Sequence, residues 1–163
     1  MRTVKVDISI YLNTDDLKLI KKVLRTSEFN NISGYFTYIF NNLLNDKIIN
    51  PVTSDEAKAL LSKRKVQPIF TEKLVTQNLE IDQDVLSIYF MNTLQDDLGA
   101  NSYWDVTSIF AYTLCQVLNN PAGSFSFGFS QHDKDLIQNV IDKAKLAKVN
   151  AMVEEGEPDD SAE

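Results

Sequence analysis

Residues 4–24, VKVDISIYLNTDDLKLIKKVL, contain two hydrophobic periods that meet at Asn13. Before Asn13, apolar and polar side chains alternate, which is the period-two pattern of a β-strand with one buried face. After Asn13, apolar residues recur every three or four positions, which is the pattern of an amphipathic helix. We therefore predict a strand over residues 4–12, followed at once by a helix that Asn13 caps and that ends near Arg25.

A second amphipathic helix follows after the polar break RTSEFNN, and we predict that it begins at Ser33. Its apolar residues fall three, four, seven and eight positions apart, so that they share one face. They are Phe36, Ile39, Phe40, Leu43 and Leu44. The first third of the chain is therefore expected to be a strand followed by two helices.

The remainder is predicted to contain more helix than strand. The expected elements are a helix from a Thr53–Glu56 capping box to about Lys65, one or two short strands over 65–81, helices over 84–98 and 104–119, an extended stretch at 123–130 and a last helix from Ser130. The sequence thus predicts a mostly α-helical α+β protein. We expect a strand–helix–helix module at 1–50, an α-rich domain for oligomerisation or partner binding at 51–149, and a disordered acidic tail at 150–163.

The charge of the chain is distributed unevenly. The net charge is −7, but residues 1–50 carry seven Lys or Arg against five Asp or Glu, and six acidic residues lie in the final ten. Binding to nucleic acid is driven mainly by cations that neutralise phosphates. The overall charge therefore argues against a nucleic acid partner, while the mildly positive first fifty residues still permit one.

The first third resembles the ribbon-helix-helix family of DNA-binding proteins, to which Arc and MetJ belong. SIYLNTDDLKLIKKVL is similar to that family's strand and first helix, and ISGYFTYIFNNLL is similar to its second helix. The resemblance implies a homodimer or higher oligomer, in which the strands of two chains pair antiparallel and complete the core. It also implies that the outward side chains of this two-stranded ribbon enter the major groove of double-stranded DNA.

The resemblance assigns DNA-contacting roles to particular residues. The start of the second helix would present free backbone N–H groups to a phosphate. Asp7 departs from the family pattern, because a carboxylate repels phosphate and reads a base only by accepting from cytosine N4. The implied contact residues are Lys5, Asp7, Ser9 and Tyr11 on the ribbon, with Ser33 and Gly34 at the helix start.

A segment further along the chain is similar in sequence to the first pair of predicted helices. With a shift of 74 positions, SGYFTYIFNNLLN lies on TSIFAYTLCQVLN. A diverged duplication, in which residues 84–120 repeat residues 10–46, would explain this match, although any two amphipathic helix pairs match to some degree. The second copy lacks the long alternating strand, and both explanations remain open.

Nothing in the sequence is arranged for catalysis. His132 is the only histidine and Cys115 the only cysteine, so neither residue type can form a metal-binding cluster. The apolar neighbours of Cys115 indicate a buried structural thiol. No glycine-rich phosphate loop is present. We therefore expect a protein with no enzymatic activity, no catalytic residue, no metal site and no cofactor.

Two functions are compatible with these features. The first is a dimeric, sequence-specific DNA-binding protein of the transcriptional repressor, plasmid-partition or relaxosome accessory type. The alternative is an acidic adaptor or inhibitor of phage or plasmid origin that binds a protein partner, with residues 51–149 available for the contact, and does not bind DNA. Asp7 and the acidic remainder favour the alternative. The lack of a signal peptide and of long apolar runs predicts a cytoplasmic protein that does not contact membranes.

Overall fold

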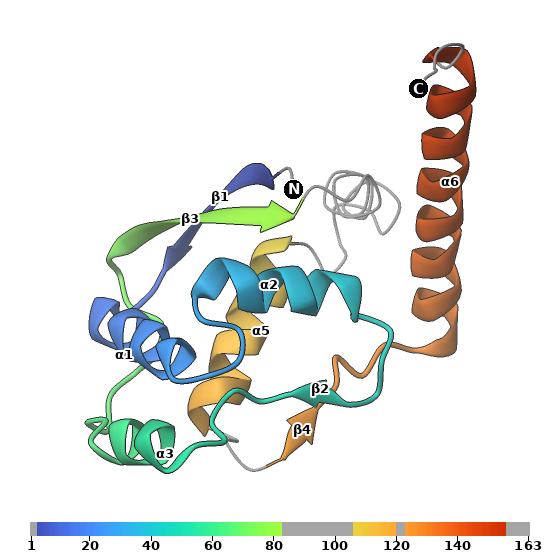
Figure 1. Cartoon of the computed structure of the whole chain (residues 1–163). Helices are drawn as coiled ribbons and strands as arrows, with labels where there is room; N and C mark the ends of the chain where they lie inside the picture. Colours follow the sequence, from blue (N-terminus) through green and yellow to red (C-terminus); the bar gives the residue numbers. More distant parts are fainter. Residues whose placement is uncertain (1–2, 83–105, 120–122, 156–163) are drawn as a thin grey trace.

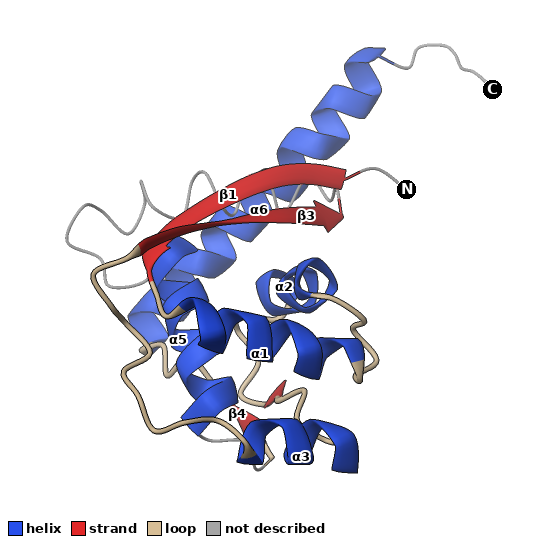
Figure 2. Cartoon of the chain, turned by 90° about the vertical axis from the view of Figure 1, so that its left-hand side faces the viewer, coloured by secondary structure: helices blue, strands red, loops and turns tan. Residues whose placement is uncertain are grey.

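The computed structural model describes residues 3–82, 106–119 and 123–155 and confirms the α+β class (Figure 1). Its elements are β1 (Thr3–Tyr11), α1 (Thr14–Arg25), α2 (Ile32–Asn41), β2 (Ile48–Ile49), α3 (Asp55–Ser62), β3 (Leu74–Asp82), α5 (Val106–Asn119), β4 (Ser124–Phe125) and α6 (Gln131–Glu155). The helix expected over 84–98 lies outside the described residues. A two-stranded ribbon, β1 with β3, lies on one side of helices α1, α2 and α5, and α3 lies on the opposite side (Figure 2).

The partner of β1 is a strand of the same chain. β1 pairs antiparallel with β3 along its whole length, and Asp7 stands opposite Asn78 at the centre of the ribbon. The resemblance implied that a second copy of the chain would supply this strand. That expectation is wrong for the paired edge, because residues 74–82 already satisfy its backbone N–H and C=O groups. The ribbon is complete within one chain.

The inner face of the ribbon contributes to the hydrophobic core. Ile8 and Ile10 of β1 and Leu79 and Ile81 of β3 are all buried. The predicted alternation of β1 is confirmed, because Asp7, Ser9 and Tyr11 are exposed while Ile8 and Ile10 between them are buried. β3 has nine residues and is therefore longer than the short strands expected from the sequence.

Helix caps fix where the first helices begin. Asn13 caps α1 as predicted, and its side chain accepts a hydrogen bond of 2.9 Å from the N–H of Asp15. α3 is capped by Ser54 instead of Thr53, because the Ser54 hydroxyl accepts from the N–H of Ala57 at 3.0 Å. Polar side chains at these positions satisfy N–H groups that have no partner inside the helix.

Residues from both predicted domains share one hydrophobic core. Phe36 of α2 stacks on Phe110 of α5, with ring centroids 4.7 Å apart. A short second sheet pairs Ile48 of β2 with Phe125 of β4. The extended stretch expected at 123–130 alternates as predicted, and its three phenylalanines are buried. Segments 1–50 and 51–149 are therefore packed against each other through many of their largest side chains.

The last helix, α6, extends away from the other elements (Figure 1). Its first half contacts the core through Ile137, which is fully buried, while Leu146 and Val149 are exposed. Ser130 caps it, accepting from the N–H of Asp133 at 3.2 Å. The helix runs to Glu155, so the expectation of a disordered tail is wrong for residues 150–155, and the rest of that segment, 156–163, lies outside the described residues.

Candidate functional site

The solvent side of the ribbon holds the largest set of side chains that we expected to bind a partner. We call this surface the ribbon face, and it is made by alternate residues of the two strands. They are Lys5, Asp7, Ser9 and Tyr11 of β1 and Leu74, Thr76, Asn78 and Glu80 of β3, all exposed. The four ribbon residues expected to contact DNA therefore lie side by side on one surface.

Side chains of the two strands bond to one another across the ribbon face. Ser9 Oγ and Thr76 Oγ1 lie 2.9 Å apart and share a hydrogen bond. Next to them, Asn78 Nδ2 donates to Asp7 Oδ1. Cross-strand pairs of this kind hold the register of a ribbon. They also occupy part of the hydrogen-bonding capacity that a ligand would use, so that binding must exchange these bonds for new ones.

The sequence analysis did not predict that β3 residues contribute half of the ribbon face. In the structure, exposed Thr76 and Asn78 alternate with buried Gln77 and Leu79, as exposed and buried residues do in β1. In the sequence only Leu79 and Ile81 alternate with polar neighbours, and we assigned no functional role to residues 74–82. Thr and Asn side chains both donate and accept hydrogen bonds, as base edges require.

The start of α2 is used for packing within the chain. Asn31, not Ser33, caps the helix, and its Oδ1 accepts from the N–H of Gly34 at 2.8 Å. The Ser33 hydroxyl accepts from the N–H of Glu80 in β3 at 2.8 Å. A Cβ atom at Gly34 would lie 2.4 Å from the carbonyl oxygen of Phe29, so glycine permits this close approach. The Gly34 N–H is therefore not free for a phosphate, contrary to our expectation.

The charges on the ribbon face are few and mixed. Lys5 is its one cation, opposed by Asp7 and Glu80, so the eight residues carry a net charge of about −1. Lys5 stands directly opposite Glu80 in the register. Tyr11 and Leu74 form an apolar pair at one end and are 56% and 54% exposed. The ribbon face thus offers hydrogen bonds and apolar contact more than electrostatic attraction.

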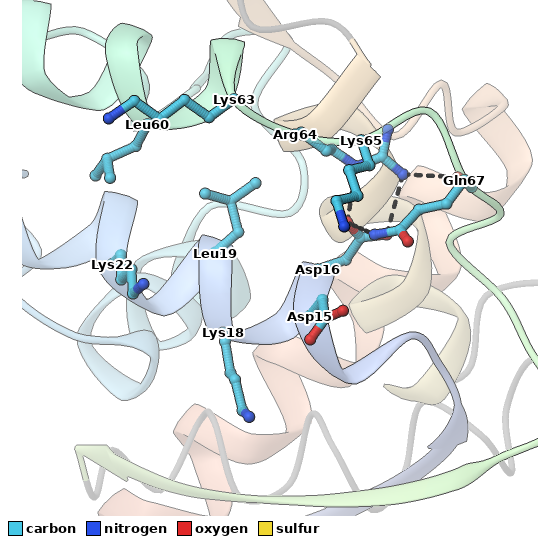
Figure 3. Close-up of a pocket in the computed structure, with 10 residues that line it drawn as sticks. All are labelled: Asp15, Asp16, Lys18, Leu19, Lys22, Leu60, Lys63, Arg64, Lys65 and Gln67. Carbon is cyan, nitrogen blue, oxygen red and sulfur yellow. Dashed lines mark hydrogen bonds and ion pairs between the residues drawn. The ribbon is translucent and has the colours of Figure 1, made fainter.

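A second surface feature is a groove of about 330 Å³ between α1 and the segment that follows α3 (Figure 3). We call it the basic groove. Leu19 and Leu60 point into the space between the two helices (Figure 3). Five cations and two carboxylates line it: Lys18, Lys22, Lys63, Arg64 and Lys65, with Asp15 and Asp16. On a chain with a net charge of −7, this is a local concentration of positive charge.

Asp16 forms a buried ion pair at one end of the basic groove. Only 1% of its side chain is exposed, and its two oxygens accept from Arg64 Nε at 2.8 Å and Arg64 Nη2 at 3.0 Å. Gln67 Nε2 also donates to Asp16 Oδ1 at 3.3 Å. The hydrogen bond to Asp16 raises the pKa of Arg64 above its ordinary value. This pair fixes the segment after α3 against α1, while the four lysines remain at the rim.

The described residues contain no group of three or more His, Cys, Asp or Glu side chains that could hold a metal ion. His132 is exposed on α6. Cys115 is half-buried in α5, and burial raises the pKa of its thiol. A raised pKa lowers the fraction of reactive thiolate at neutral pH. The thiol is less buried than the sequence predicted.

Comparison of the chain with family models, curated proteins and solved structures found no match. Among the described residues, no helix combines the length and the apolar character that crossing a membrane requires.

Proposed function

We propose that the protein binds double-stranded DNA by placing the ribbon face in the major groove. The observation that carries the proposal is the complete antiparallel ribbon of one chain, with Ser9, Thr76 and Asn78 directed to solvent above the helices. The major groove is wide enough to admit a two-stranded ribbon, and its base edges present donors and acceptors to such side chains. The argument from architecture to function is an analogy with known ribbon proteins.

The charge of the ribbon face determines what kind of binding we expect. Phosphate contacts supply most non-specific affinity, and here Lys5 is the one cation available on this face. Affinity should therefore depend weakly on salt, and base contacts should contribute a large share of it. Asp7 favours a cytosine, whose N4 amino group is the donor a carboxylate can accept from.

The test is selection of binding sequences from a randomised duplex library at low salt, followed by measurement of affinity for the selected duplex. Ser9→Ala, Thr76→Ala and Asn78→Ala should each weaken binding by about 5-fold to 150-fold, because a base contact contributes about 1–3 kcal/mol. Ser62→Ala is the matched control, since Ser62 lies in α3, on the side of the helices opposite the ribbon (Figure 2). It should leave affinity unchanged.

Charge reversal gives a second readout of the same contact. Asp7→Lys replaces a repelled carboxylate with a cation beside the phosphates, so retention should increase. The dependence of log affinity on log salt should steepen by about one unit for the added phosphate contact. If no duplex in the library is retained even at low salt, binding to DNA is refuted.

The basic groove favours a second candidate function, which is binding of an acidic protein segment. Leu19 and Leu60 would contact its apolar side chains, and Lys18, Lys22 and Lys63 its carboxylates. The probe is a fluorescent peptide of alternating Glu and Leu. The double variant Lys18→Glu/Lys22→Glu should abolish its binding, while Lys143→Glu/Lys145→Glu on exposed positions of α6 should not. Equal loss in both double variants would refute binding in the groove.

A further inference from the structure

The two strands of the ribbon correspond to each other residue by residue. Adding 71 to a residue number in β1 gives its counterpart in β3, so that Ile8 corresponds to Leu79 and Ile10 to Ile81, all buried. The same shift places Asp7 on Asn78, and these two residues are paired opposite each other in the ribbon. Each is the fifth residue of a nine-residue strand. A two-fold axis through the centre of the ribbon would relate one strand to the other.

α2 and α5 correspond in the same way, with a shift of 74. The counterparts share their burial at six positions across three turns: Ile32 and Val106, Tyr35 and Ile109, Phe36 and Phe110, Ile39 and Thr113, Phe40 and Leu114, Leu43 and Val117 are all buried. Phe36 and Phe110 also contact each other, with their rings stacked. A pair of counterparts in mutual contact is again what a two-fold axis produces where it passes through the molecule.

The packing of helices on strands is reciprocal. α2 packs against β3, and its counterpart α5 packs against β1, so each helix contacts the strand of the other half. Reciprocal contact is the signature of an isologous arrangement, in which residue i of one unit meets residue j of the other and the reverse. Any two antiparallel strands of equal length pair their central residues, so the evidence beyond the ribbon is the reciprocal packing together with the stacking of Phe36 on its counterpart Phe110.

We infer that the segments carrying β1 and α2 and those carrying β3 and α5 are two copies of one strand–helix unit, so that a single chain presents a complete two-stranded binding surface. The inference rests on the proposed function for the identity of the ligand, which is duplex DNA. The three-residue difference between the two shifts lies in the connections, residues 12–31 and 83–105. The internal match at a shift of 74 in the sequence is thereby assigned to duplication.

Fusion of the two copies allows the two halves of the surface to differ. Lys5 corresponds to Thr76 and Ser9 to Glu80, so that only the central Asp7–Asn78 pair is chemically similar on the ribbon face. In symmetric dimers the palindrome of the DNA site mirrors the two-fold symmetry of the protein. A single chain with two different halves is therefore expected to bind one non-palindromic duplex, with one chain per site.

The first test is independent of DNA. Light scattering on the full chain should give a single species of 18.5 kDa, the mass of one chain. In a Cys115→Ala background, the double variant Asp7→Cys/Asn78→Cys should oxidise to a disulfide within one chain, because directly opposite residues of a ribbon have the Cα separation that a disulfide needs. Lys5→Cys/Thr76→Cys is the control, since these residues lie four positions out of register and should not cross-link.

Two results would overturn the inference. One is a wild-type mass of two chains, and the other is a disulfide that joins two chains in the Asp7→Cys/Asn78→Cys variant. The mass of the wild-type chain decides the question even if the cysteine variant does not fold. Native mass spectrometry of the complex with the selected duplex should then show one chain per duplex, and two chains on a palindromic site would also refute the inference. Absence of any DNA complex refutes the proposed function and leaves the two DNA-independent measurements to decide whether one chain completes the two-stranded surface.

Discussion

Asp16 shows how one residue acquires a role that its position in the sequence does not reveal. It sits in the first turn of α1, where a carboxylate interacts favourably with the helix dipole. In the structure its side chain is almost fully buried and pairs with Arg64, 48 positions away in the sequence. Removing one partner from a buried ion pair leaves the other charge without compensation. The pair should therefore matter more for stability than an exposed one.

Arg64→Ala should lower the free energy of unfolding by about 3–5 kcal/mol, because the buried Asp16 carboxylate would lose its counter-ion. The measurement is urea denaturation followed by circular dichroism. Lys63→Ala, at the exposed neighbouring position, is the control and should change the value by less than about 0.5 kcal/mol. A loss below about 1 kcal/mol in Arg64→Ala would show that water replaces the guanidinium and that the pair is not structurally important.

At the scale of secondary-structure elements, Gly34 determines how the start of α2 packs against the preceding turn. Gly34→Ala should destabilise the fold by about 1–3 kcal/mol, since the added Cβ would meet a backbone oxygen, Phe29 O, at 2.4 Å and the chain must move. Thermal unfolding measures the effect. Ala59→Ser, at an exposed position of α3, is the control and should leave the melting temperature nearly unchanged. A stabilised Gly34→Ala variant would contradict the close approach seen here.

The elements with regular periods could be predicted from the sequence, and those with interrupted periods could not. β1 alternates strictly and α1 follows a clear capping residue, Asn13, so their bounds were predicted closely. β3 was underestimated because Gln77 occupies a core position and Leu74 an exposed one, which breaks the alternation. Gln77 tolerates burial because its Nε2 donates to the carbonyl of Asn78 at 2.6 Å. The local sequence does not indicate that this polar side chain occupies a buried position.

The same limit applies to the candidate site. The alternation in residues 4–12 placed Ser9 and Tyr11 on the ribbon face correctly, because strand periodicity is a local property. The use of the α2 start by β3 could not be predicted, since Ser33 meets Glu80 only after the chain has folded. We assigned the partner strand to a second chain because proteins of the ribbon-helix-helix family, which the sequence resembles, form their ribbon from two chains.

At the scale of the whole molecule, one shared core means that the first fifty residues depend on the rest. β1 obtains its partner strand from β3, and Phe36 of α2 obtains its stacking partner from α5. A fragment of residues 1–50 would expose both contacts to water. Burial of apolar surface is the main favourable contribution to folding, and a chain of this length without its partners buries too little.

We therefore predict that the fragment 1–50 is unfolded in isolation, as measured by far-ultraviolet circular dichroism and by the narrow dispersion of its amide proton signals. Residues 1–155, which retain all the described elements, are the control and should fold with one cooperative transition. A fragment 1–50 that folds as a homodimer would have replaced β3 with a second β1. That result would restore the two-chain ribbon implied by the family resemblance, because identical strands would then suffice where the full chain uses two different ones.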